Sequence, residues 1–345
     1  MRPRVSVIMP VYNAEAYLRE VLDALDAQTC PSMEVIAVDD GSRDRSGSLL
    51  DAYAGQHPWL RVIHKRNEGI FRARETGISE ARGEYIGFCD NDDLPSPELY
   101  QKLYDAASQA GADMAVCSFV REEMETGRVL SHEMTALAGR VIDLDSDPTA
   151  MAVINTSPWN KLYRAELLRK AGTFDPPPRL LEDVILNASV YPLMHRVVII
   201  PDMLYRYRIR RDSSILTINK GDLPTIERCL LSVRSDVERS AAQNSAQMLR
   251  LLDSMAFIHL GVSVVLRRIQ GGDSIRQAVA DARGCLDRGF PLYGRPEYGL
   301  GWNIRNGGVM LKPLIALRCF QLRLMGPLFA VYRLVTEKLH REIKW

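Results

Sequence analysis

The residues best suited to chemistry are three carboxylates within four positions, Asp90, Asp92 and Asp93, which follow an apolar, β-prone segment at 85–89. Like charges at the end of a buried strand repel one another and resist burial, so a neutralising cation is expected beside them. Carboxylate oxygens on a short loop suit Mg²⁺ or Mn²⁺, which bind through one or two carboxylates together with substrate phosphates. The alternative is a turn into a helix, with Ser96 as N-cap and Pro97 at the first helical position.

A second acidic pair, Asp39 and Asp40, follows another apolar segment at 33–38. A third such segment, 5–9, runs into Pro10 and Tyr12, which supply a ring on which a base could stack. In an open α/β sheet, ligands bind beyond the carboxyl ends of the strands. These three segment ends are therefore expected to meet at one site.

The segments between these strands show helical spacing of apolar residues, at 17–28, 49–53 and 71–81, with a further short strand at 60–64. This alternation favours an α/β fold with a Rossmann-like, mostly parallel central sheet flanked by helices. The chain has no Gly-x-Gly-x-x-Gly run after its first strand and no Walker A lysine loop. Any phosphate must be held by metal and side chains.

Four motifs in register resemble a family 2 glycosyltransferase of the inverting, surface-polysaccharide type, which has the GT-A fold. They are VSVIMPVYN at 5–13, VDDGS at 38–42, AR at 73–74 and GEYIGFCDNDD at 83–93. The acceptor half of the family is matched by WNKLY at 159–163, LED at 181–183, and YRYR at 205–208 with SSI at 213–215. The resemblance covers about the first 215 residues and implies the roles given below.

For the donor, the resemblance implies contacts to the uracil and ribose of a UDP-sugar from Pro10, Tyr12, Asp39 or Asp40, and Arg74. Asp90 and Asp92 match the Asp-x-Asp motif, one reaching the ribose and the other an Mn²⁺ or Mg²⁺ ion that bridges the phosphates. Because guanidinium groups recognise phosphate oxygens, the cluster Arg206, Arg208, Arg210 and Arg211 could close over the diphosphate.

For the acceptor, the resemblance implies that Asp183, second of a pair with Glu182, takes a proton from the attacking hydroxyl in a single displacement with inversion. Trp159 and Tyr163 are candidate acceptor contacts. Each role has a structural alternative. The acidic pair could be the first turn of a helix, the two aromatic rings could belong to the core, Arg74 could lie on an exposed helix face, and 205–211 could be an edge strand.

Two positions depart from the family pattern. Glu75 stands where many members have Asn, and Leu181 stands where Gly often precedes the acidic pair. These differences put donor contacts and the shape of the acceptor loop in question more than the type of reaction. No Gln-x-x-Arg-Trp motif occurs, which argues against a processive polysaccharide synthase.

Length and composition fit a catalytic domain over 1–218, with a nucleotide-sugar half at 1–120 and an acceptor half at 121–218, followed by a helical region at 219–345. A net charge of +1 gives no indication of nucleic-acid binding. The six cysteines form no Cys-x-x-Cys pair and are expected to be reduced. No signal peptide is evident, and the uncharged stretch 254–266 is short for a spanning helix, so we expect a cytoplasmic protein.

The segment 302–345 has eight basic residues against two acidic ones, a local charge of +6, alongside many apolar side chains. A basic amphipathic segment of this kind can lie on an anionic membrane surface. Its apolar face could equally pack on the catalytic domain or on a second copy in a homo-oligomer.

The expected function is transfer of a hexose or acetamidohexose from a UDP-sugar to a glycan or lipid-linked acceptor, in bacterial cell-surface polysaccharide biosynthesis. A sugar-1-phosphate nucleotidyltransferase would need a glycine-rich, basic N-terminal loop, which is missing. An inactive relative acting as a scaffold or glycan-binding protein is the other alternative.

Overall fold

The structure is a computed structural model that describes residues 3–135, 137–210, 220–239, 244–296, 298–305, 308 and 310–339. The chain divides into two compact units, Met1–Leu144 with Thr156–Ser213, and Asp145–Asn155 with Ser214–Trp345. The segment Asp145–Asn155, which the sequence analysis placed in the acceptor half, belongs to the second unit. Its short helix η1 (Pro148–Ala152) packs on α8 (Ser245–Ala256), a long-range contact that no local pattern reveals.

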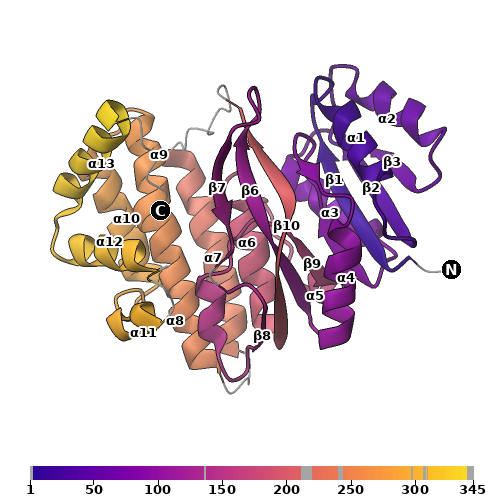
Figure 1. The fold of residues 1–345 in the computed structure, drawn as a ribbon. Helices are drawn as coiled ribbons and strands as arrows, with labels where there is room; N and C mark the ends of the chain where they lie inside the picture. Colours follow the sequence, from indigo (N-terminus) through magenta and orange to yellow (C-terminus); the bar gives the residue numbers. More distant parts are fainter. Residues whose placement is uncertain are drawn as a thin grey trace. The chain divides into compact units, whose positions relative to one another are not determined.

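The amino-terminal half of the first unit is the predicted parallel sheet (Figure 1). Its strand order is β3-β2-β1-β4, and all three pairings are parallel. The strands are β1 (Val5–Val11), β2 (Met33–Asp39), β3 (Leu60–His64) and β4 (Tyr85–Phe88). Parallel strands pair in this way because helices connect them and cover the faces. The sequence prediction for this half is confirmed.

The same sheet continues through the acceptor half in the order β9-β6-β10-β5. These strands are β9 (Lys161–Arg164), β6 (Met114–Glu123), β10 (Arg196–Ile209) and β5 (Leu94–Pro95), while β7 (Val129–Glu133) pairs with β6 and β8 (Arg140–Asp143) pairs with β10. β9 is antiparallel to both β4 and β6, whereas β6 and β10 are parallel. One sheet therefore runs through both predicted halves.

The side chains of β1 alternate between two faces, as the pleat of a strand requires. Val5, Val7 and Met9 lie in a core that also includes buried residues of α1 (Leu18–Asp26), α2 (Ser46–Ala54) and α4 (Leu99–Ala110). Ile8 faces α3 (Ile70–Glu80) on the other side. The helix expected to begin at Ser96 and Pro97 instead begins at Leu99, because the preceding residues form β5.

The second unit is helical in the part that the structure describes, which confirms the predicted helical appendage. After α7 (Leu223–Arg239), a continuous run is formed by α8, η4 (Phe257–Val264) and α9 (Val265–Gln270). Then follow α10 (Ile275–Gly289), α11 (Leu300–Arg305), α12 (Leu311–Gln321) and α13 (Met325–Leu339), whereas α5 (Ala165–Lys170) and α6 (Glu182–Val190) belong to the first unit.

The run Ser245–Gln270 is 26 residues long and apolar enough to cross a membrane by length and composition. The sequence analysis took only 254–266 as apolar and judged it short, and this estimate of length is wrong because the helix includes flanking turns. Of its most apolar window, 67% is buried, which is typical of a core helix. The six cysteines are free, and five of them are buried.

Gly77 allows α3 to approach β1 closely. A Cβ atom added at Gly77 would lie 2.4 Å from Cγ2 of Ile8, which is fully buried. We therefore expect Gly77→Ala to lower the free energy of unfolding by about 1–3 kcal/mol through overpacking. Urea denaturation would measure this. Gly55→Ala is the control, because its Cβ would make only ordinary contacts at 3.6 Å and its backbone is right-handed. Equal stability of the two variants would contradict the prediction.

Candidate active site

The acidic loop after β4 is held in place by residues distant in sequence. The backbone N–H of Asp90 donates to the Tyr205 hydroxyl at 3.2 Å, and Nδ2 of Asn91 donates to the carbonyl of Pro10 at 2.9 Å. The backbone N–H of Arg208 donates to Oδ1 of the fully buried Asp93 at 2.8 Å. The loop is thus fixed between the end of β1 and β10, at the carboxyl end of the parallel strands.

Arg74 lies at the centre of the acidic cluster. Its side chain is buried on α3, and its guanidinium donates to Oδ1 of Asp183 in a short ion pair. The same group lies 3.4 Å from Oδ1 of Asp90 and 3.7 Å from Oε1 of Glu182. The exposed helix face considered as an alternative for Arg74 is therefore wrong. One buried cation joins the predicted Asp-x-Asp motif to the predicted catalytic pair.

Glu182 and Asp183 form the first turn of α6, so the helical alternative is also correct for them. The residue before them, Leu181, has a left-handed backbone with φ of 56°, the conformation that glycine adopts most easily. This explains why Gly often stands at that position in the family. The turn directs Oδ1 of Asp183 toward Arg74, while its Oδ2 makes no hydrogen bond to the residues that the structure describes.

The cluster holds more negative charge than Arg74 neutralises. Burial, together with repulsion from Asp183 and Asp92, raises the pKa of Asp90 to about 7 against the opposing effect of Arg74. Burial and the charge of Asp183 raise the pKa of Glu182 to about 7. Burial also raises the pKa of Asp92, and raises that of Asp93 well above its ordinary value. A further cation would be stabilised here.

The chemistry of these ligands fits Mg²⁺ or Mn²⁺. Asp90 and Asp92 present partly exposed carboxylates, and Nη2 of Arg210 lies 3.2 Å from Oδ2 of Asp92. No group of three histidine, cysteine, aspartate or glutamate side chains able to hold a metal occurs among the described residues. That excludes a closed, all-protein site in this part of the chain. It agrees with an ion that uses one or two carboxylates and completes its shell with phosphates.

Asp39 and Asp40 occupy different environments. Asp40 accepts hydrogen bonds from the backbone N–H groups of Glu68 and Gly69, at 3.0 and 2.8 Å, and so shapes the entry to α3. Asp39 accepts from the backbone N–H of Ser42 at 2.9 Å and contacts Nδ1 of His64 at 2.8 Å. Tyr12, predicted to stack on the base, is 44% exposed. Which aspartate contacts a nucleotide stays a prediction.

The predicted arginine cluster is divided among several partners. Arg206 pairs with Glu122 of β6 at 2.9 Å, and Nε of Arg208 donates to the carbonyl of Asp92 at 2.5 Å. Arg208 also pairs with Glu20 at 2.5 Å, so it supports the acidic loop in this structure and does not lie open for a diphosphate. Among the described arginines of this cluster, Arg210 is the one that pairs with a carboxylate of the Asp-x-Asp motif, that of Asp92. Arg211 and the motif at 213–215 lie outside the described residues.

Both aromatic residues predicted to contact the acceptor are buried, and their role in acceptor binding stays a prediction. Tyr163 is fully buried on β9, and its hydroxyl donates to Oδ1 of Asn187 at 2.8 Å. Trp159 is only 3% exposed, and its ring stacks on Tyr205 and Tyr207 with centroids 4.5 and 5.2 Å apart. The alternative that both rings belong to the core therefore describes this structure.

The sequence did not reveal that Tyr205, Asn91 and Arg208 hold the acidic loop in place. Their partners lie far away in the sequence, so no spacing announces them. A signal was nevertheless present in the sequence. Tyrosine and arginine alternate over 205–208, and such side chains can bind an acidic loop such as 90–93. The sequence had suggested phosphate binding or an edge strand for 205–211, and neither predicts these contacts to the acidic loop.

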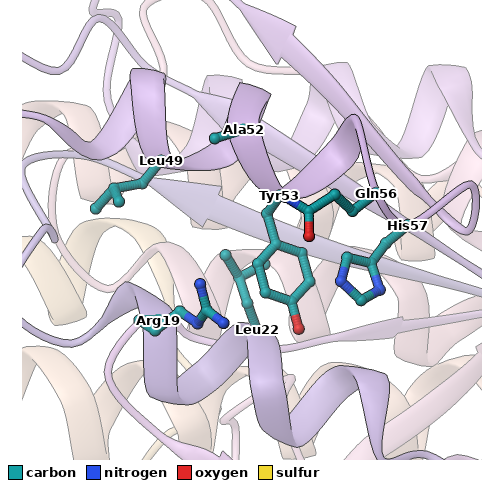
Figure 2. A pocket seen from close by; sticks show the side chains of 7 residues that line it. All are labelled: Arg19, Leu22, Leu49, Ala52, Tyr53, Gln56 and His57. Atoms are coloured by element: carbon teal, nitrogen blue, oxygen red, sulfur yellow. The ribbon is translucent and has the colours of Figure 1, made fainter.

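A separate hollow of about 70 Å³ lies between α1 and α2 (Figure 2). The rings of Tyr53 and His57 stack there with centroids 4.1 Å apart. Their polar atoms are already paired, the Tyr53 hydroxyl with Asp23 and Nδ1 of His57 with Asp26. This hollow is too small for a nucleotide sugar.

A family model described as glycosyl transferase family 2 matches residues 6–180. The chain belongs to glycosyl transferase family 2. The matched region includes Arg74, Asp90 and Asp92 and ends just before Glu182. The resemblance drawn from the motifs is thereby confirmed.

Two curated relatives support this family 2 assignment. EpsJ of Bacillus subtilis (strain 168), named an uncharacterized glycosyltransferase, is 36% identical over 214 residues, which is 60% of this chain and 62% of EpsJ. The poly(ribitol-phosphate) beta-glucosyltransferase of Bacillus spizizenii is 28% identical over 220 residues, 62% of this chain and 34% of that protein. The matches thus span less than two thirds of either relative.

Among solved structures, S. aureus TarS 1–349 in complex with UDP-GlcNAc has a TM-score of 0.68 at 19% identity. The alignment covers 92% of each chain. The likeness at this identity concerns the fold, and it confirms the GT-A prediction for this family 2 chain with helices after the sheet.

His64 links Asp39 to Asp51, which lies 3.0 Å from its Nε2, and both carboxylates raise the pKa of His64. A raised folded pKa gives stability that is present below the unfolded pKa of about 6.5 and is lost as pH rises through the folded value. We expect His64→Gln to reduce stability more at pH 6 than at pH 9.

Urea titrations of the wild type and the variant across this range would measure the difference. Asp51→Asn is the control, since it removes one of the two carboxylates and should weaken the pH dependence only in part. A difference between wild type and His64→Gln that does not change with pH would refute the ion-pair account.

Proposed function

We propose that this family 2 protein transfers a sugar from a UDP-sugar to a hydroxyl of a glycan or lipid-linked acceptor, with inversion at the anomeric carbon. The main support for this proposal is that Arg74 contacts both Asp90 of the Asp-x-Asp motif and Asp183 of the acidic pair. Donor and acceptor chemistry then meet in one cluster. The biosynthesis of a bacterial cell-surface polysaccharide is the proposed setting, and the bacterial relatives support it.

The UDP donor is proposed from the motifs, and the UDP-GlcNAc bound to TarS supports it. A hexose or an acetamidohexose is the proposed sugar. The name of the poly(ribitol-phosphate) relative, a glucosyltransferase acting on a polymer, supports a polymeric acceptor. Tyr12, at the end of β1, has the exposure that stacking on uracil requires.

Asp90 and Asp92 would hold the Mn²⁺ or Mg²⁺ ion beside the diphosphate. The ion, when bound, supplies charge stabilisation to the departing diphosphate. Arg210, paired with Asp92, is the arginine best placed to add a guanidinium to the same phosphates. Arg208 holds the loop that carries these groups.

Asp183 is the proposed general base. Its Oδ1 is fixed by Arg74, so Oδ2 remains to accept the proton of the attacking hydroxyl. The contact with Arg74 orients the carboxylate, which secures its alignment with the acceptor hydroxyl. Glu182 adds negative charge beside it and would help to hold the base in its working orientation.

We also propose a cytoplasmic location, peripheral at the inner face of the plasma membrane, with the basic segment 302–345 as the part that meets the lipid. Of that segment, 306–307, 309 and 340–345 lie outside the described residues. A homo-oligomer through the same segment is the competing proposal.

The donor proposal is tested by calorimetric titration with UDP, GDP and ADP, each with and without Mn²⁺. We expect binding to UDP that is tighter with Mn²⁺ and weak binding to the other two nucleotides. Asp92→Asn should remove the metal dependence, whereas Asp105→Asn should leave it unchanged, because the Asp105 carboxylate accepts a hydrogen bond from Gln101 of the same helix, α4. Binding of none of the nucleotides would favour the inactive, glycan-binding alternative.

The base proposal is tested by Asp183→Asn. Loss of the proton acceptor should lower transfer by about 10²–10⁴-fold while UDP binding is retained. A screen of UDP-sugars with radiolabel transfer to membrane glycans would measure turnover, with Asp105→Asn as the control. Near-normal transfer by Asp183→Asn would refute the base role, and loss of UDP binding would assign Asp183 to the structure of the cluster instead.

A further inference from the structure

The second unit has a groove of about 590 Å³ between the segment 294–300 and α12. This volume lies within the range of about 300–1,000 Å³ typical of small-molecule sites. Its lining is mainly apolar, from Pro296, Leu300, Leu314, Ile315, Cys319 and Leu322. Two arginines, Arg295 and Arg318, also line it.

Apolar exposure in the second unit is concentrated around this groove. Leu300, Ile315 and Leu322 line the groove and are 63%, 47% and 67% exposed. The other large exposed hydrophobic side chains described in this unit are Ile304, Leu311, Leu324 and Val331, all between 300 and 331. Described residues of α7 to α10 contribute none. The three exposed apolar side chains that line this groove are of the kind that marks a site of interaction.

The sequence around the groove is mainly basic. Between residues 294 and 336 it has six basic residues and one acidic residue, Glu297, which lies outside the described residues. Arg295 and Arg318 line the groove, and Lys312 and Arg323 are exposed near it in the sequence. An occupant must therefore combine hydrocarbon with negative charge.

We propose that the groove binds an acyl chain of an anionic phospholipid in a membrane leaflet, with its phosphate at Arg295 and Arg318. A second copy of the chain fits less well, because a symmetric pairing of this face would bring basic surfaces together. An acidic peptide would neutralise the arginines, but the apolar side chains of Leu300 and Leu322 would remain exposed to water. The proposal deepens the proposed membrane location, on which it rests, and is independent of the transfer chemistry.

The first test is sedimentation of the full chain with vesicles of phosphatidylcholine alone or mixed with phosphatidylglycerol. We expect binding only to the anionic vesicles. Arg295→Gln with Arg318→Gln should weaken it about 25-fold, since each basic residue near the surface contributes about fivefold. Ile315→Gln with Leu322→Gln should weaken it at least about tenfold through lost apolar contact.

Val141→Gln is the matched control, an equally exposed apolar residue on β8 of the first unit, and should bind vesicles like the wild type. UDP titration of every variant separates this proposal from the proposed reaction, because groove variants should bind UDP normally. Unchanged vesicle binding by both double variants would overturn the groove. A dimer in light scattering that Ile315→Gln with Leu322→Gln dissociates would overturn the lipid in favour of a second copy.

The second test asks whether hydrocarbon enters the groove. Ile315→Trp places a fluorophore there, and lipids brominated on the acyl chain should quench its added emission. Val141→Trp is the control and should show no added quenching. Binding to anionic vesicles without quenching of Ile315→Trp would show attraction by charge alone and would overturn the acyl-chain site.

Discussion

The structure of the candidate site depends on one buried guanidinium, that of Arg74. Asp183, Asp90 and Glu182 surround it, and burial would be unfavourable for any of these charges alone. Burial opposes the charge on Arg74 as well, but the carboxylates outweigh this effect and raise its pKa. Arg74 reaches its place because Gly77, almost one turn later on α3, lets the helix lie close to Ile8 of β1.

The same dependence explains why the donor loop and the acceptor half cannot be separated. The backbone N–H of Asp90 donates to the hydroxyl of Tyr205, and the carboxylate of Asp93 accepts from the backbone N–H of Arg208. Each partner on β10 lies 115 residues further along the chain. β10 is in turn paired over most of its length with β6. The loop that carries the Asp-x-Asp carboxylates is therefore as rigid as the sheet behind it, which suits a site that must align two substrates.

Much of the fold followed from local patterns. The parallel strands and the helix that carries Arg74 begin and end within one or two residues of their predicted limits, because hydrophobic periodicity and turn residues are local signals. Side-chain partners are not local. Trp159 and Tyr163 are aromatic residues of the kind that form a sugar platform, yet their buried side chains contact residues 24 or more positions away in the sequence. The transfer of Asp145–Asn155 to the second unit was hidden for the same reason.

The net charge of +1 conceals two local imbalances of opposite sign. In the first unit, burial and mutual repulsion raise the pKa of Asp90, Asp92 and Asp93, so the cluster favours additional cations. In the second unit, six basic residues and one acidic residue accompany exposed apolar side chains over 294–336, so that segment favours an anion with a hydrocarbon part. The acidic cluster belongs to the first unit and the basic segment to the second, so the two groups of charge are separated in the sequence. Such an arrangement costs stability unless each imbalance is met by a ligand, which is why both are better explained by binding than by folding.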